Sequence, residues 1–507
     1  MQKHKNIFSQ RLPAKGTKQI APDSARLAGA LRAIGYKFEH AVADLVDNSI
    51  NAGAKNIVIR FITEGETLLA FAICDDGRGM DDDTISEAMR FGSKDEYEPD
   101  SLGKYGMGLK LASMSHAKVL TLVSRKAGVS EGRRWTPEGI ANDWSVDFLV
   151  EEDFESTLDD TWQNLDLADS GTIVIWKEID RLKISSKGLH PTIRNLKKRL
   201  AKHLGLTFHR FIEDDRLKIV IDDRENGEPE KENYANVDSL NPFGFSQWPS
   251  SDYPRYFNAT LPELGKLTLR AHICPPNSKA KEYKLIGNAA ALQGFYFYRN
   301  DRLIQTGGWN ALVDAEAEPH GSLARVSIDL PPKMDGDFGL NVQKSAVITP
   351  QSFISSVRES DSPQGITFAD FRNAADEIYR NTDDSAAHIA PMIPSGDIPP
   401  DLTKLAERWF KEKGGKYRRI KLVWSDLDGP EVFEIQSDKN TILLNERYRK
   451  TILGPRRRSK QDLPLLKTAI FLLLKDFLIK KRLSKKDKEQ LAAVEGLIRA
   501  AAKLSKG

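Results

Sequence analysis

Residues 41–54 read AVADLVDNSINAGA, and their pattern is that of a helix with one polar face. Asp44 and Asn48 stand four positions apart, so their side chains emerge on the same side of such a helix. A carboxylate beside a carboxamide suits water activation next to a hard cation, with the carboxylate as base and the amide oxygen as ligand. A solvated polar face ending in an Asn-Ala-Gly turn has the same pattern, so the stretch indicates a site only in the company of others.

Two further stretches that contain glycines support the presence of a site. CDDGRGM (Cys74–Met80) follows an apolar strand pattern, and its Asp75 is placed to accept a hydrogen bond from an exocyclic amine. SLGKYGMGLKLASMSHA (Ser101–Ala117) opens a helix with three glycines and two lysines, which predicts an anion cradle of backbone N–H groups. The chain contains no G-x-x-x-x-G-K-[ST] sequence, so this cradle is not a Walker A loop.

Around these stretches the hydrophobic periodicity predicts alternating helices and strands, which is typical of mixed α/β layers. Residues 379–400 are rich in Pro, Ser and Asp without periodicity and are predicted to be a linker. The predicted domains are 1–185, 186–378 and 401–507. Predicted helices are 24–34, 40–50, 82–90, 108–116, 193–203, 368–379, 461–481 and 485–503; predicted strands are 55–61, 67–74, 119–124, 172–177, 217–222, 267–273, 294–304 and 324–330, with a strand hairpin within 420–444.

Charge is sorted along the chain of 507 residues. The total of 75 Lys and Arg against 72 Asp and Glu is nearly balanced, but residues 401–507 carry 27 against 14 and residues 1–400 carry 48 against 58. The last part is therefore strongly basic, and Arg456, Arg457, Arg458 and Lys460 form its most compact cation cluster. Such a cluster is the electrostatic footprint of phosphate-backbone binding, although a solvated basic face that balances the acidic body would look the same.

Composition also bears on the compartment. Two cysteines, Cys74 and Cys274, are too few for a disulfide framework or a cysteine zinc site and favour a reducing, cytoplasmic setting. The N-terminal sequence lacks the apolar region of a secretory signal. The most apolar stretch, LPLLKTAIFLLLKDFLIKK, contains Lys467, Lys475 and Asp476, so we expect no membrane span.

In this order, DLVDNSINAGA, DDGRGM and GKYGMGLK resemble the motifs of the GHKL ATPases, the superfamily of gyrase B subunits, heat-shock chaperone ATPases, sensor histidine kinases and MutL. Within it, GKYGMGLKLASM, LGLTFHRFIE and QGFYFYRNDRLI are most similar to the Microrchidia (MORC) ATPases and their prokaryotic relatives. The resemblance covers about residues 20–365 and implies an α/β (α+β) fold: a Bergerat-type ATPase sandwich, an α/β transducer domain and then a small basic C-terminal domain of unknown type.

The resemblance implies ATP and Mg²⁺ as cofactors and a role for each matching residue. Asp44 stands at the position of the general base, Asn48 at that of the Mg²⁺ ligand and Asp75 at that of the adenine acceptor. Lys344, within GLNVQKSAV, matches the transducer cation at the γ-phosphate, and Gln343 stands beside it. The adenine pocket would be lined by Gly79, Met80 and Thr172, and the phosphates would be wrapped by Gly103, Lys104, Gly106, Gly108 and Lys110.

One position departs from the family. The base is usually Glu, and Asp44 is one methylene shorter, which predicts slow hydrolysis or action through a second water because general-base geometry tolerates little displacement.

The expected activity is that of an ATP-gated homodimeric clamp, with residues 92–102 as its lid, acting on DNA without base specificity. DNA compaction or DNA-linked defence is what the MORC resemblance implies. Alternatives are a chaperone-like ATPase with protein clients and a non-hydrolysing nucleotide-sensing scaffold. A histidine kinase is disfavoured because only about 40 residues precede the Asn-bearing motif, and a topoisomerase because no nucleophilic-Tyr domain is recognised.

Overall fold

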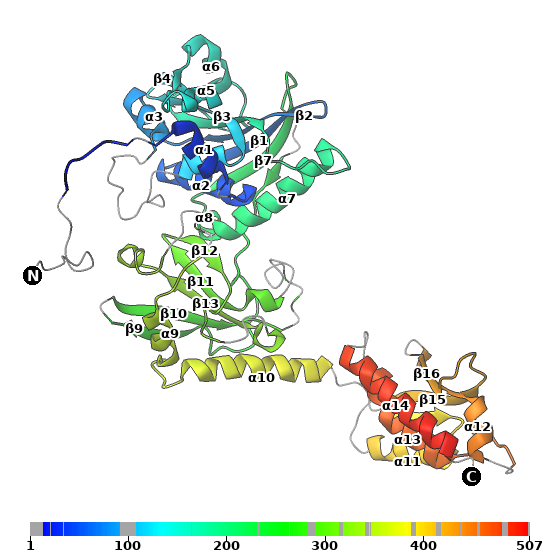
Figure 1. Cartoon of the computed structure of the whole chain (residues 1–507). Coiled ribbons are helices and arrows are strands. Elements are labelled where there is room, and N and C mark those ends of the chain that lie inside the picture. Colours follow the sequence, from blue (N-terminus) through cyan, green and yellow to red (C-terminus); the bar gives the residue numbers. More distant parts are fainter. Residues whose placement is uncertain are drawn as a thin grey trace, which may run out of the picture. The chain divides into compact units, whose positions relative to one another are not determined.

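The chain folds as two compact units, Met1–Tyr379 and Arg380–Gly507 (Figure 1). No helix among the described residues is long and apolar enough to cross a membrane. The computed structural model describes residues 14–20, 22–33, 35–91, 108–163, 165–230, 234–262, 264–276, 278, 280, 289–313, 318–339, 344, 346–386, 392–411, 417–436, 439–453, 457–478 and 485–504.

An eight-stranded mixed sheet forms the first part of unit 1, in the order β5-β4-β3-β6-β2-β1-β7-β8. Its central strands are apolar and β-branched on both faces, as expected for strands covered on two sides. The antiparallel register sets Asp75, the last residue of β2, opposite Ile57 on one side and Thr172 on the other. The strands are β1 (Asn56–Glu64), β2 (Thr67–Asp75), β3 (Ala117–Lys126), β4 (Val129–Trp135), β5 (Asp147–Phe148), β6 (Gly171–Ile179), β7 (Lys218–Glu225) and β8 (Ala235–Asn236).

Helices cover both faces of this sheet. One face packs against α1, α2, α4 and α7 in the largest apolar core (Figure 1), and the other packs against α6 and the segment that follows it. α2 packs its apolar face on β1 and β2. In this position its polar residue Ser49 reaches Asp75 at the end of β2. The helices are α1 (Ser24–Ala33), α2 (Phe38–Asn51), α3 (Asp82–Met89), α4 (Gly108–Met114), α5 (Pro137–Ala141), α6 (Glu151–Leu158), α7 (Leu189–Thr207) and α8 (His209–Glu213).

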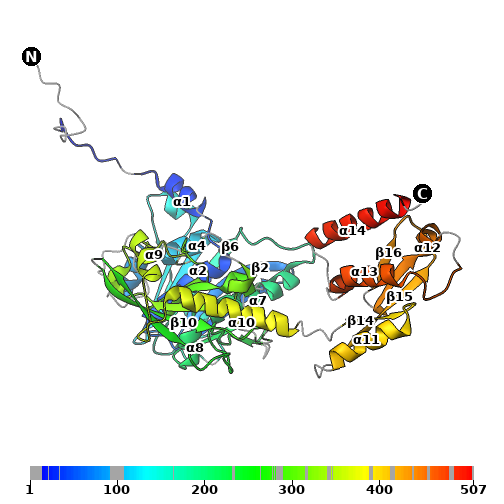
Figure 2. The same ribbon diagram turned by 90° about the horizontal axis from the view of Figure 1, so that it is seen from below.

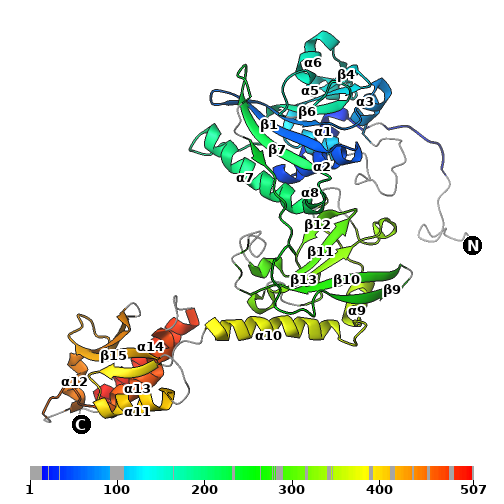
Figure 3. The ribbon, with the colours of Figure 1, turned by 180° about the vertical axis from the view of Figure 1, so that it is seen from behind.

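One strand lies in a different sheet from the one we predicted. The strand expected at 217–222 in the second domain is β7, and it pairs in parallel with β1 of the first sheet (Figure 3). The long helix α7 lies in the connection from β6 to β7, and its apolar residues from Leu189 to Leu204 belong to the core of the first sheet. The first layer thus extends beyond residue 185.

A five-stranded sheet, in the order β12-β11-β13-β10-β9, forms the second part of unit 1. Its core is aromatic: Phe257 of β9 and Phe295 of β11 are buried against Phe353 of α9 and Phe368 of α10. Figure 2 shows α9 and α10 from the side on which they pack. The single strand predicted at 294–304 is two strands, because Asn300 and Asp301 both adopt positive φ and turn the chain back. The elements are β9 (Arg255–Leu261), β10 (Gly265–Ile273), β11 (Gly294–Arg299), β12 (Arg302–Thr306), β13 (Ala324–Asp329), α9 (Gln351–Arg358), α10 (Phe368–Ala386) and the 3₁₀ turns η2 (Ala289–Leu292), η3 (Pro319–Gly321) and η4 (Pro332–Met334).

The two sheets of unit 1 share a small apolar cluster. Leu206 at the end of α7 packs with Tyr296, Tyr298 and Leu303 of the second sheet. This contact brings the tip of the β11–β12 hairpin next to α8 and the body of α2, which is where the candidate site lies.

Unit 2 is a four-stranded sheet, in the order β14-β15-β17-β16, packed with helices. The expected hairpin is only partly correct: β16 and β17 pair antiparallel, but β15 and β17 pair in parallel. The predicted linker 379–400 contains the end of α10 and the edge strand β14. The elements are β14 (Met392–Gly396), β15 (Arg418–Ser425), β16 (Phe433–Gln436), β17 (Thr441–Asn445), α11 (Pro400–Lys411), α12 (Glu446–Leu453), α13 (Pro464–Leu474), η6 (Lys475–Leu478) and α14 (Lys485–Leu504).

Candidate functional site

Asp44 lies buried on α2 at the junction of the two sheets. The Tyr36 hydroxyl donates to its Oδ2, while Oδ1 has no hydrogen-bond partner among the described residues. Two cations lie just beyond hydrogen-bond range of Oδ1: Arg302 Nη2 at 3.6 Å and Lys344 Nζ at 3.7 Å. Burial raises the pKa of Asp44, since the charged carboxylate loses water that the nearby cations replace only in part. A buried carboxylate with a raised pKa, and with one oxygen that accepts no hydrogen bond from the described part of the chain, is equipped to take a proton from water.

Asp47, one turn along α2, binds the same two cations directly. Arg302 Nε donates to its Oδ1 at 2.8 Å, and Lys344 Nζ donates to its Oδ2 at 2.5 Å. Both cations come from the second sheet or its following loops, more than 250 residues away in the chain. The structure therefore brings Lys344 to the polar side of α2, next to Asp44 and Asp47.

Asp75 is held at the end of β2 by two donors. Ser49 Oγ donates to Oδ2 at 2.7 Å, and the backbone N–H of Gly77 donates to Oδ1 at 3.0 Å. Burial raises the pKa of Asp75 to about 6, against the opposing effect of these hydrogen bonds. The carboxylate keeps unused lone pairs, so it remains an acceptor for a ligand.

The turn after Asp75 needs glycine at position 79. Gly79 has a φ of +66°, and a Cβ there would lie 1.8 Å from the carbonyl oxygen of Arg125, so no other residue fits without moving the backbone. This close approach lets the Met80 N–H donate to Ser124 Oγ at 2.8 Å. Ser124 Oγ also lies 2.8 Å from Thr172 Oγ1. Gly79, Met80 and Thr172 thus gather beside Asp75.

The start of α4 lies against Asp44. A Cβ built on Gly108 would be 3.9 Å from the Cβ of Asp44, so the third motif meets the first here. Lys110, on the same helix, is buried, and burial lowers its pKa to about 8. Asn48 is exposed on α2. The predicted lid 92–102 and the residues Gly103, Lys104 and Gly106 lie outside the described residues, as does Gln343.

The basic cluster of the C-terminal unit is exposed where it is described. Arg457, Arg458 and Lys460 present their side chains to solvent, with one carboxylate, Glu446 Oε1, at 3.9 Å from Arg458. Arg456 lies outside the described residues. In contrast, Lys467 is fully buried, and its ammonium donates to the carbonyls of Asp397 and Lys460 at 2.7 Å each.

Sequence reasoning missed four residues of this site: Tyr36, Ser49, Ser124 and Arg302. The contact of Ser49 with Asp75 depends on how α2 docks on β2, which no local pattern indicates. Arg302 lies in a stretch that carried the resemblance, but nothing local signals that it reaches Asp47. No group of three or more His, Cys, Asp or Glu side chains able to hold a metal occurs among the residues that the structure describes.

Known proteins match the part of the chain that contains these motifs. The family model described as "Histidine kinase-, DNA gyrase B-, and HSP90-like ATPase" matches residues 36–172. The DNA mismatch repair protein MutL of Dictyoglomus turgidum is 40% identical over 96 residues, which are 17% of this chain and 16% of that protein. Human ATPase MORC2 is 37% identical over 90 residues (17% and 9%), and Protein MICRORCHIDIA 6 of Arabidopsis thaliana is 34% identical over 91 residues (17% and 13%).

The matches thus span less than a fifth of each of these relatives, and they confirm the resemblance and the α/β fold class where the three motifs lie. Residues 36–172 are a GHKL-type ATPase domain, with MORC and MutL proteins among its relatives.

Proposed function

We propose that the chain binds ATP with Mg²⁺ and hydrolyses it, and that the nucleotide closes a homodimeric clamp that acts on DNA. The observation that carries this proposal is the contact of Lys344, from the second sheet, with Asp44 and Asp47 on the site helix. A cation delivered from another layer to the reacting end of a nucleotide site links that layer to the state of the phosphate.

The polar groups around Asp75 fit adenine. A buried carboxylate with spare lone pairs can accept from the exocyclic amine, and Ser49 and Gly77 keep it oriented. At Gly79 the backbone of the turn lies directly against the carbonyl oxygen of Arg125. Because no side chain stands between them, a flat ring can lie against Met80 and Thr172.

The groups near Asp44 fit the phosphates and their metal. Asn48 offers an exposed amide oxygen, which suits Mg²⁺, and Lys110 with the N-terminus of α4 offers positive charge. When bound, Mg²⁺ neutralises phosphate charge. Asp44 would orient the attacking water and take its proton on Oδ1, the oxygen that accepts no hydrogen bond from any described residue. By resemblance, Gly103, Lys104 and Gly106 complete this cradle.

DNA is the partner that the basic C-terminal unit favours. Exposed Arg457, Arg458 and Lys460 suit phosphate contacts, which position a protein on DNA without reading its sequence. One relative of the ATPase domain is named a DNA mismatch repair protein. We therefore propose that binding is independent of base sequence and weakens steeply with salt.

The test of the clamp uses the full chain. ATP turnover is measured with and without double-stranded DNA, and mass is measured by light scattering with a non-hydrolysable ATP analogue. We expect DNA to raise turnover and the analogue to double the mass. A monomer at saturating analogue contradicts the clamp, and turnover indifferent to DNA favours a protein client instead.

A second candidate function, a nucleotide-sensing scaffold, is favoured by Asp44 itself. The shorter side chain is already bonded to Tyr36, which would leave it poorly placed for hydrolysis. ATP binding and dimerisation without measurable turnover would support the scaffold and reject the hydrolase.

Acid should weaken nucleotide binding through Asp75. Its carboxylate protonates below about pH 6, and the neutral carboxyl that results is a weaker acceptor for the adenine amine than the carboxylate. We expect affinity for ATP to fall between pH 7 and pH 5, by up to about tenfold per pH unit below that pKa. Asp75→Asn should bind weakly at both pH values, and calorimetric titration of both proteins separates this effect from protonation of the phosphates.

Protonation of Asp75 has the opposite effect on the stability of the fold, which it increases. Because the pKa of Asp75 is raised in the folded state, its contribution to stability is present below the unfolded pKa of 3.8 and is lost as pH rises through about 6. Weaker binding at pH 5 therefore cannot come from Asp75 unfolding the domain. A thermal melt at both pH values checks this point, and equal affinity of the wild-type chain at pH 5 and 7 contradicts the assignment of Asp75.

A further inference from the structure

Arg302 is the first residue of β12 and directly follows the two-residue turn Asn300-Asp301. Both the backbone conformation of this turn and its contacts with neighbouring arginines fix its position. Asn300 and Asp301 have φ of 47° and 63°, the positive values that a tight hairpin turn uses. Asp301 accepts from Arg210 at 3.2 Å and from Arg216 at 2.8 Å, two residues on or next to α8. The hairpin is therefore tied to the first sheet's layer at its tip, and Arg302 is held at that junction.

The guanidinium of Arg302 has partners on both layers. Nε donates to Asp47 Oδ1 at 2.8 Å, and Nη1 donates to the backbone carbonyl of Lys344 at 3.2 Å. Nη2 lies 3.6 Å from Asp44 Oδ1. Only 2% of the side chain is exposed, against 18% for Lys344. One rigid group thus contacts the site helix and the backbone of the residue that delivers the second cation.

We propose that Arg302 is a positioning residue of the ATPase site. It acts through Asp44 and Lys344: it orients the two carboxylates of α2 and holds the Lys344 backbone so that the lysine side chain reaches the site. This inference rests on the proposed hydrolysis of ATP. It deepens that function by naming the group that aligns the second sheet with the site.

The chemistry requires arginine and not merely a positive charge. One planar fork donates to two acceptors in different directions and faces a third oxygen, Asp44 Oδ1, at 3.6 Å, whereas the ammonium of a lysine is a point charge on a flexible stem. A lysine at 302 would keep the charge that balances Asp47 but could not also reach the Lys344 carbonyl. Arg302→Lys should therefore leave the charge and disturb the alignment.

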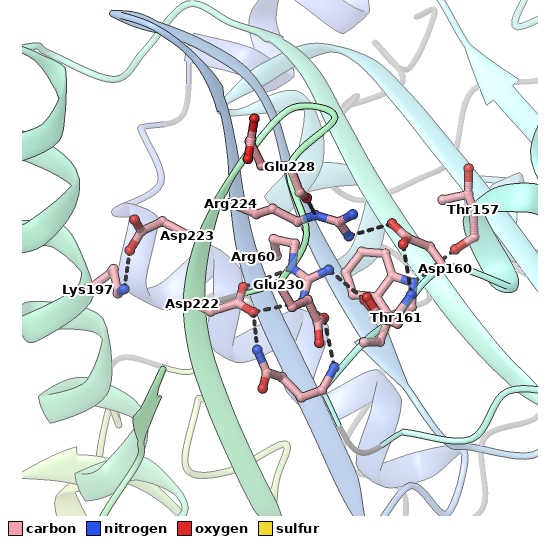
Figure 4. Close-up of polar contacts among 12 residues, drawn as sticks. Arg60, Thr157, Asp160, Thr161, Lys197, Asp222, Asp223, Arg224, Glu228 and Glu230 are labelled. Atoms are coloured by element: carbon pink, nitrogen blue, oxygen red, sulfur yellow. Dashed lines mark hydrogen bonds and ion pairs between the residues drawn. The ribbon is translucent and has the colours of Figure 1, made fainter. Parts of the chain in front are cut away.

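A purely structural ion pair is the competing explanation, and the chain offers a matched control for it. Arg60 on β1 is as buried as Arg302, with 1% of its side chain exposed, and binds Asp222 through two hydrogen bonds of 3.0 and 2.7 Å (Figure 4). It also contacts Glu230 and the Thr161 carbonyl, and it stacks over Trp162. These partners lie on the face of the sheet opposite α2, so Arg60→Lys breaks an equivalent pair away from the site.

The experiment compares Arg302→Lys with Arg60→Lys in the full chain, by steady-state ATP turnover and thermal unfolding. Both variants should melt at a lower temperature than the wild-type chain. We expect Arg302→Lys to lower kcat at least tenfold, since small misplacements of reacting groups can cost about a hundredfold, and to change KM for ATP less than about threefold. Arg60→Lys should keep kcat within about twofold.

A double variant separates alignment from charge balance and is less prone to unfold. Asp47→Asn with Arg302→Gln replaces the buried ion pair by two amides, and Lys344, which also loses the Asp47 carboxylate, keeps Asp44 as its carboxylate neighbour. If Arg302 positions the site, kcat stays low in the double variant; recovery of wild-type kcat means that Arg302 only cancels charge and overturns the proposal. Equal kcat in Arg302→Lys and Arg60→Lys overturns it as well. Absence of turnover in the wild-type chain would instead reject the hydrolase function on which the proposal rests.

Discussion

Asp44→Asn is expected to lower kcat for ATP by about a hundred- to ten-thousand-fold, the range that general-base catalysis supplies, and to leave nucleotide binding nearly unchanged. The amide is isosteric with the carboxylate and can still accept from the Tyr36 hydroxyl, so the fold is preserved. It cannot take a proton from water, which is the role that we propose for the open Oδ1. Steady-state turnover and calorimetric titration with ATP measure the two quantities.

Asp44→Glu is the companion variant. Glutamate restores the length that the family usually has at this position, but the extra methylene must fit among Tyr36, Arg302 and the start of α4. We expect turnover well above that of Asp44→Asn. If Asp44→Asn hydrolyses ATP within threefold of the wild-type rate, the base is a different group, and Asp44 is a structural carboxylate.

Asn48→Ala should abolish Mg²⁺-dependent turnover, to about 1% of wild type or less, because the proposed amide ligand is removed. The side chain is exposed, so its loss should change the free energy of unfolding by no more than about 0.5 kcal/mol. Turnover across a Mg²⁺ titration and the melting temperature are the measurements. The dimer that forms with a non-hydrolysable analogue should be lost too.

Asn236→Ala is the matched control, since Asn236 is an exposed asparagine on the edge strand β8, paired to β7 and not to any strand that carries the site. It should keep both turnover and stability. Wild-type turnover in Asn48→Ala would reject the placement of the metal on α2 and, with it, the correspondence between this helix and the family's Asn-bearing motif.

Much of the fold followed from local pattern. The helices containing Asp44 and Gly108 and the strands ending near Asp75 and beginning near Thr172 lie within a few residues of their predicted bounds. Their periodicity is strong because each packs one face, or both, into the core. The errors concern partners: β7 joined the first sheet in parallel, and β15 and β17 became a parallel pair. Strand pairing across a long crossover leaves no local signal.

Consecutive residues were enough to identify the family that the ATPase domain resembles, the order of its three motifs and the residues that those motifs carry, because spacing within a helix or a turn is a local property. The distant groups that complete the site are brought there by the packing of the layers. Ser49 bonds Asp75, Tyr36 bonds Asp44, and Arg302 reaches Asp47 across two sheets. These contacts depend on how packed layers dock, and no stretch of neighbouring residues contains that information.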